Sequence, residues 1–121
     1  MLTGAIILFL VGAVFGLTVL AQLLKGKPSP KTAVYVHGLL VATGLILVIL
    51  VVTGANPHGA AGGPTGALLV LVIAALGGLT LFILDQSRKT MPRPLLILHP
   101  ILAVIGVIML ILFALQTIGT M

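Results

Sequence analysis

The chain of 121 residues contains no cysteine, no tryptophan and a single acidic residue, and only 6% of its residues are charged. Without cysteine it forms no disulfide, no thiolate nucleophile and no cysteine-ligated cluster. The one acid, Asp85, lies at the end of a long apolar run, and glutamate is absent. This argues against a small multidrug exporter, which needs a carboxylate inside the membrane. Motifs of hydrolytic triads, phosphate loops and nucleotide-binding folds are also missing.

Hydrophobic residues are what the chain has in abundance. They make up 60% of it, and its mean hydropathy is +1.41. A soluble domain of this size cannot bury so much apolar surface. A membrane-spanning helix needs about 20 apolar residues, and runs of that length cover 2–24, 33–54, 66–85 and 95–117. We therefore predict an all-α integral membrane protein, a single domain over residues 1–121 in which four spanning helices form a bundle.

The basic residues gather in two of the three connections between these runs. The segments 25–31 and 88–93 contain all six, whereas the 55–65 connection and both termini contain none. Loops rich in Lys and Arg stay on the cytoplasmic side. We expect both basic loops in the cytoplasm and both termini outside, in the inner membrane of a bacterium or archaeon. The net charge of +5, confined to these two loops, suits contact with lipid headgroups rather than with nucleic acid. We assign no role to His58, which lies in the 55–65 connection.

The two halves of the chain resemble each other when the sequence is shifted by 62 residues. Between 3–54 and 65–116, 15 of 52 aligned positions are identical, against on the order of a tenth expected by chance. The identities include rare residue types, among them the pair His37 and His99. We interpret this pattern as two parallel two-helix repeats. Repeats of this kind are related by a pseudo-two-fold axis along the membrane normal.

This axis gives His37 and His99 equivalent positions on the second and fourth helices, roughly 6–8 Å inside the cytoplasmic end. Ionisable residues inside a membrane are costly and mark functional sites by default. Three interpretations are open. The rings can hydrogen-bond neighbouring helices and only hold the bundle together, or they can bind one b-type haem as its two axial ligands. They can also bind another metal, although zinc and copper normally require three or four protein ligands.

Glycines near each histidine suit a flat porphyrin. Gly44 and Gly106 each follow a histidine by seven residues and so return to nearly the same helix face. Gly16 and Gly78, on the first and third helices, lie near the same depth, and we expect those helices to close on the edges of the macrocycle there. Ordinary close packing of helices accounts for such glycines equally well.

Polar residues at the membrane boundary complete the candidate site. Lys31 and Arg93 are repeat equivalents, each six residues before a histidine. In a haem protein they are expected to pair with the propionates, and otherwise they act as topology signals and headgroup contacts. Asp85 precedes Lys89 by four residues and is predicted to form a local ion pair with it. Tyr35 is predicted to anchor its helix at the interface.

With histidines on the second and fourth helices, glycines seven residues further on and basic residues at the membrane boundary, the chain resembles four-helix, bis-histidine membrane b-type cytochromes. The resemblance is one of arrangement and covers all four helices. It implies one haem b held by His37 and His99, and electron exchange with quinone or with other subunits of a membrane complex. The alternative is a cofactor-free accessory or assembly subunit of a larger membrane complex. A transporter or channel is disfavoured because the interior has too few polar groups to line a path.

Overall fold

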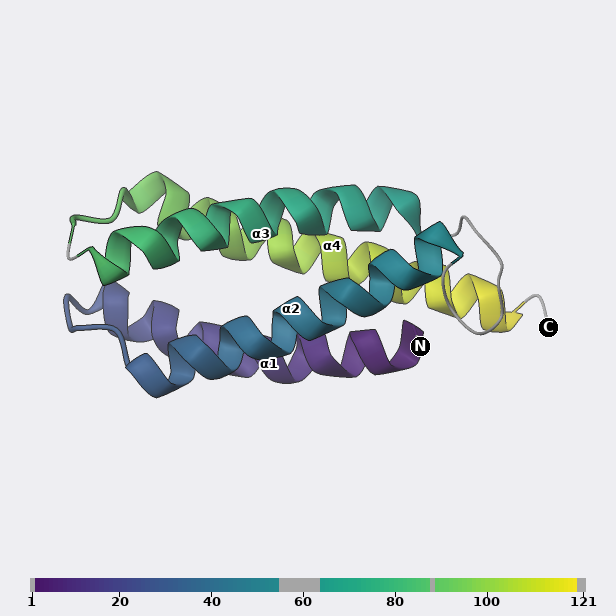
Figure 1. Cartoon of the computed structure of the whole chain (residues 1–121), viewed down its shortest axis with the longest axis horizontal. Coiled ribbons are helices and arrows are strands. Elements are labelled where there is room, and N and C mark those ends of the chain that lie inside the picture. Colours follow the sequence, from purple (N-terminus) through teal and green to yellow (C-terminus); the bar gives the residue numbers. More distant parts are fainter. Residues whose placement is uncertain (1, 55–63, 88, 120–121) are drawn as a thin grey trace.

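The computed structural model describes residues 2–54, 64–87 and 89–119, and within these ranges every regular element is an α-helix (Figure 1). The helices are α1 (Leu2–Leu24), α2 (Lys31–Thr53), α3 (Thr65–Gln86) and α4 (Arg93–Gly119). Each is long and apolar enough to cross a bilayer. The predicted all-α membrane bundle is confirmed, and the helix ends lie within two residues of the predicted ones.

Proline and glycine set several helix ends. Pro30, Pro64 and Pro92 immediately precede α2, α3 and α4, and each accepts a first-turn hydrogen bond through its carbonyl at 2.9–3.0 Å. Proline suits this place because its fixed φ fits the start of a helix and no helical N–H is lost there. Gly26 and Gly54, just after α1 and α2, have φ values of 74° and 76°, which side-chain-bearing residues rarely adopt.

The four helices form two hairpins, α1 with α2 and α3 with α4. Contacts are most extensive within each hairpin, and the hairpins meet less extensively through α1 with α4 and α2 with α3. Helices α2 and α4 are therefore diagonal to each other. Both short loops lie at one end of the bundle, and the beginning of α1 and the end of α4 point to the other (Figure 1). The two basic loops thus share one end, as the charge pattern predicts.

The packed core occupies the half of the bundle away from the short loops. Its buried side chains are Ala5, Phe9, Val48, Ala67, Leu71 and Leu110. Each member has a counterpart in the set 62 residues away, as the predicted duplication requires, although the duplication itself stays an interpretation of the sequence. Exposed leucine, isoleucine and valine side chains cover the outside of all four helices, which suits contact with lipid.

Candidate functional site

His37 is half-buried and turned toward α1. Its Nδ1 lies 2.8 Å from the carbonyl oxygen of Gly12. A carbonyl can only accept a hydrogen bond, so Nδ1 must carry the proton and donate it. In the neutral ring Nε2 is then unprotonated, and its lone pair is available to bind a metal.

His99 has the same arrangement in the second hairpin. Its Nδ1 donates to the carbonyl oxygen of Ala74 on α3 at 2.7 Å, and both bonds join residues 25 positions apart. Ala74 and Gly12 are related by the 62-residue shift. Both rings therefore adopt the same tautomer and leave the same nitrogen for a ligand. The sequence analysis did not identify these carbonyl partners, because every residue has a backbone carbonyl and residue type does not indicate which one accepts a hydrogen bond.

Gly16 and Gly78 make room for the two rings. A Cβ at Gly16 would lie 2.8 Å from Cε1 of His37, and a Cβ at Gly78 would lie 2.7 Å from Cε1 of His99. Real Cβ atoms essentially never approach so closely. The groups that these two glycines accommodate directly are therefore the imidazole rings. Their expected place at the edges of a macrocycle stays a prediction.

The two rings meet across the boundary between the hairpins. Their centres are 6.4 Å apart and their planes are inclined at 87°. An imidazole nitrogen lies about 2.0–2.1 Å from a metal such as zinc and about 1.1 Å from its ring centre, so two rings on opposite sides of one metal have centres about 6.3 Å apart. Rotation of a ring about its metal–nitrogen bond leaves this spacing unchanged. The spacing of the ring centres therefore agrees with two ligands of one metal, and it also lies in the range of about 4.5–7 Å that is ordinary for an edge-to-face ring contact.

A cavity of about 490 Å³ surrounds both rings and takes its walls from all four helices. The lining is largely apolar, with Ser29, Tyr35 and Asp85 as polar exceptions besides the histidines. Pro100, inside α4, lines it together with its repeat equivalent Gly38. Pockets for cofactors and small molecules commonly measure about 300–1,000 Å³ and are mostly apolar. The volume and the apolar lining are therefore those of a pocket for a small molecule or a cofactor.

Tyr35 belongs to the wall of this cavity as well as to the exposed surface of α2. Its ring packs edge-to-face against Phe82 of α3, with centres 6.1 Å apart. The amide of Gln86 donates a hydrogen bond to its hydroxyl oxygen at 3.4 Å. These contacts join the two hairpins. Sequence reasoning missed them because the repeat equivalent of Tyr35 is Ile97, which offers no matching signal.

Gly44 and Gly106 lie outside the lining of this cavity, contrary to expectation. A Cβ at Gly44 would come within 3.1 Å of Phe9, and a Cβ at Gly106 within 2.7 Å of Leu71. Both glycines face the neighbouring helix of their own hairpin, and a core side chain fills the space beside each. They serve the close packing of α1 on α2 and of α3 on α4.

Asp85 is paired across the two hairpins, and the predicted ion pair with Lys89 is wrong. Its Oδ2 lies 2.8 Å from Nζ of Lys31, and the hydroxyl of Ser29 donates to both carboxylate oxygens at 2.9 and 2.8 Å. Ser29 is buried, whereas the side chain of Lys31 is 53% exposed. The cluster ties the first short loop to the end of α3.

Replacing Ser29 with alanine is expected to destabilise the bundle by about 1–3 kcal/mol, because a buried hydrogen bond to a charged carboxylate is lost. Replacing Lys31 with alanine is expected to cost less, about 0.2–1 kcal/mol, because its ion pair is exposed. Unfolding in detergent, followed by helical circular dichroism, measures both. Ser87→Ala, at the exposed end of α3, is the matched control. Equal stability of the Ser29 and Ser87 variants would contradict the role given to this cluster.

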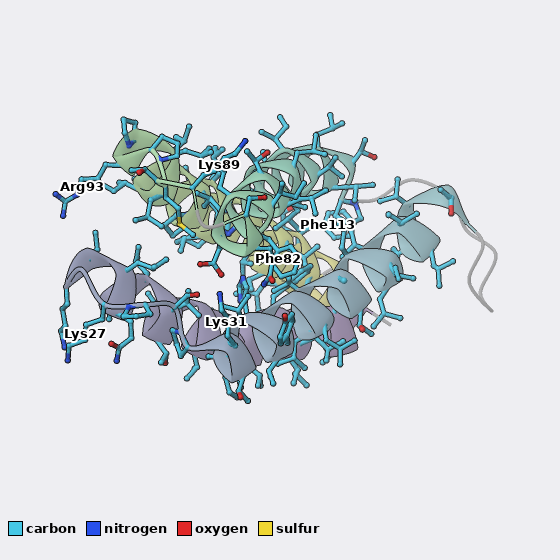
Figure 2. The ribbon with its side chains drawn as sticks, turned by 60° about the vertical axis from the view of Figure 1, so that its left-hand side comes forward. Lys27, Lys31, Phe82, Lys89, Arg93 and Phe113 are labelled. Atoms are coloured by element: carbon cyan, nitrogen blue, oxygen red, sulfur yellow. The ribbon has the colours of Figure 1, made fainter. Side chains whose placement is uncertain are left out.

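Neither Lys31 nor Arg93 lines the histidine cavity. Arg93 lines a second cavity of about 430 Å³ between the two short loops. Ser29 and Asp85 line both cavities, so the two spaces adjoin at this cluster. Lys31 and Arg93 come from different hairpins at the end that carries these loops (Figure 2). Their pairing with propionates stays a prediction.

Metals other than haem iron find too few ligands in the described part of the chain. No group of three or more His, Cys, Asp or Glu residues is close enough there to hold a metal ion. A haem asks less of the protein, since the porphyrin supplies four nitrogens to iron and the chain only the axial ligands. His58 lies outside the described residues.

The histidine pair, its two glycines and the apolar cavity thus form one site built from both hairpins. No protein-family model, curated protein or solved structure matches this chain.

Proposed function

We propose that this chain is a membrane b-type cytochrome that transfers electrons through one haem b, with His37 and His99 as its axial ligands. The ring pair carries the proposal: the ring centres are 6.4 Å apart, and each Nδ1 is bonded to a backbone carbonyl. Metal-bound histidines almost always donate their second ring N–H to such a partner, which fixes the ring and makes the ligating nitrogen more basic. The apolar cavity around the pair supports the proposal.

When bound, the haem supplies a one-electron couple between ferric and ferrous iron. The chain determines the conditions for that couple. Helices α2 and α4 present the two ligands, Gly16 and Gly78 leave room for the rings, and the apolar walls keep water from the metal. Cations near the loops favour the form with less positive charge, so they shift the equilibrium toward ferrous iron.

The propionates are proposed to face the short loops, where Lys31 and Arg93 supply cations. Lys31 already neutralises Asp85, whose carboxylate lines the histidine cavity and would otherwise repel a propionate. Arg93 lines the adjoining cavity, and guanidinium groups bind carboxylates well.

One haem near one end of the bundle cannot carry electrons across the whole bilayer. It therefore suits electron exchange with quinol in the bilayer or with a partner subunit. That end is proposed to face the cytoplasm, with both termini outside, because the positive-inside rule favours this orientation for the two basic loops. The proposed location is the inner membrane of a bacterium or archaeon.

The alternative is a cofactor-free accessory or assembly subunit. It is favoured by the same two hydrogen bonds, because His37–Gly12 and His99–Ala74 already join the helices of each hairpin. Polar contacts of this kind stabilise membrane bundles by up to about 2 kcal/mol without any cofactor. Under this alternative the two rings, whose centres are 6.4 Å apart, pack edge-to-face across the hairpin boundary, as Tyr35 and Phe82 do.

The test is a dithionite-reduced minus oxidised visible spectrum of the detergent-purified chain, expressed with ample haem. The expected result is the sharp α band of a low-spin b-type haem, with a haem-to-protein ratio close to one. A ratio close to two would contradict a single site. A colourless protein would refute the cytochrome and leave the accessory subunit.

A further inference from the structure

We propose that the cavity between the two short loops binds one anionic phospholipid, which bridges the two hairpins. This cavity measures about 430 Å³ and lies at the end of the bundle that carries the two short loops. Its lining combines cationic side chains with apolar ones. Arg93 is also the cation proposed above for a propionate, so this inference is tested at Lys27 and Lys89, and lipid retention and the haem spectrum are separate measurements.

The charge in this cavity selects an anion. Lys27, Lys89 and Arg93 line it, and the acidic residue of the lining is Asp85. The carboxylate of Asp85 already has an ammonium partner, Lys31, at 2.8 Å. The lining is therefore positive in sum, and the hydroxyl of Thr90 adds a hydrogen-bond donor. A phosphate group matches this set of donors.

The apolar part of the lining selects a lipid among anions. Leu23, Leu24 and Leu96, near the ends of helices long enough to span a membrane, line the same cavity together with Met91 of the second short loop. A soluble phosphate would leave these side chains uncovered, whereas the first carbons of an acyl chain would cover them. Basic pockets between transmembrane helices on the cytoplasmic side bind anionic headgroups in this way.

The position of the cations makes the lipid a bridge. Lys27 belongs to the loop of the first hairpin and Lys89 to that of the second, and the two are 62 residues apart. Figure 2 shows Lys27 on the first hairpin and Lys89 on the second. The hairpins contact each other less than their own helices do. A phosphate attracted by both loops therefore strengthens the contact between the two hairpins, which is weaker than the packing within each hairpin.

Native mass spectrometry of the full chain in an uncharged detergent tests this proposal. Phosphatidylglycerol is added at increasing concentration, with phosphatidylcholine of the same acyl chains as the uncharged comparison. One phosphatidylglycerol per chain is expected, with phosphatidylcholine bound much more weakly. Lys27→Gln and Lys89→Gln are each expected to weaken retention about fivefold. Lys25→Gln, an exposed lysine of the same loop outside the cavity lining, is the matched control and leaves retention unchanged.

Lys27→Arg and Lys89→Arg keep the charge and are expected to retain the lipid, which guards against variants that merely misfold. Equal weakening by the Lys25 variant would overturn the proposal in favour of general surface attraction. Equal retention of phosphatidylcholine would overturn it as well, since the cations would then select nothing. Displacement of phosphatidylglycerol by millimolar inorganic phosphate would show that the cavity takes a free anion and not a lipid.

Discussion

Replacing either His37 or His99 with alanine is expected to abolish the low-spin haem band. Loss of an outer hydrogen-bond partner already lowers metal affinity about 10–100-fold, and loss of the ligand itself exceeds that. The remaining histidine leaves a five-coordinate, high-spin haem or no haem at all. Because the two sites are equivalent, the two variants should behave alike. Absorbance in the α-band region and the haem content of purified protein provide the measurement.

Two controls make this result specific. His58→Ala changes the third histidine of the chain and is expected to leave the spectrum intact. Added imidazole is expected to fill the space left by the deleted ring and to restore the low-spin band in both alanine variants. If His37→Ala and His99→Ala keep the wild-type spectrum, the rings hold helices together and do not bind iron.

Replacing Gly78 with alanine is expected to displace the His99 ring. The added Cβ would lie 2.7 Å from Cε1 and 3.2 Å from Nε2, and the ring is held by its hydrogen bond to Ala74. Overpacking of this kind costs about 1–3 kcal/mol. If the ring moves away from Ala74, haem affinity is expected to fall about 10–100-fold as well. Haem titration and unfolding in detergent measure the two effects separately.

Gly77→Ala is the matched control for this experiment. It makes the same substitution one residue earlier on α3, where a Cβ would make only ordinary contacts, at 3.7 Å from Cδ1 of Leu95 and at 3.9 and 4.0 Å from Cβ and Nδ1 of His99. It is expected to leave both haem affinity and stability close to wild type. Equal behaviour of the Gly77 and Gly78 variants would mean that the His99 ring has room to shift, and the fit of the ring to α3 would then be unimportant.

The sequence predicted the helices well because their signals are local. Long apolar runs mark the spans, and the helix starts, predicted from these runs alone, lie one or two residues earlier, directly after Pro30, Pro64 and Pro92. The face of α2 that carries His37 was also predicted correctly, since Gly44 lies on that same side, toward α1. What fills the space beside Gly44 depends on another helix. Phe9 occupies it, and no local pattern in α2 indicates this.

The partner of Asp85 is a second example of a contact decided by tertiary structure. Lys89 is closer along the chain, and a continuing helix would bring it within reach. Helix α3 ends at Gln86, so the required helical turn does not form. Lys31, 54 residues away, takes the position instead, together with Ser29. The ion pair of Asp85 with Lys31 depends on where α3 ends and on how close the two hairpins are. Neither can be read from the spacing of residues in the sequence.

The hydrogen bond from His37 to Gly12 lies entirely within the first hairpin, and this affects the state of the chain during its synthesis. During synthesis at about 5–20 residues per second, the 62 residues between the two histidines take about 3–12 s to follow. Once α2 has been completed at Thr53, the first ring has a hydrogen-bond partner inside its own hairpin. The Nδ1–H of His37 therefore has a hydrogen-bond acceptor before the second hairpin is made. The two-histidine site forms only after the second hairpin has been synthesised and has packed against the first.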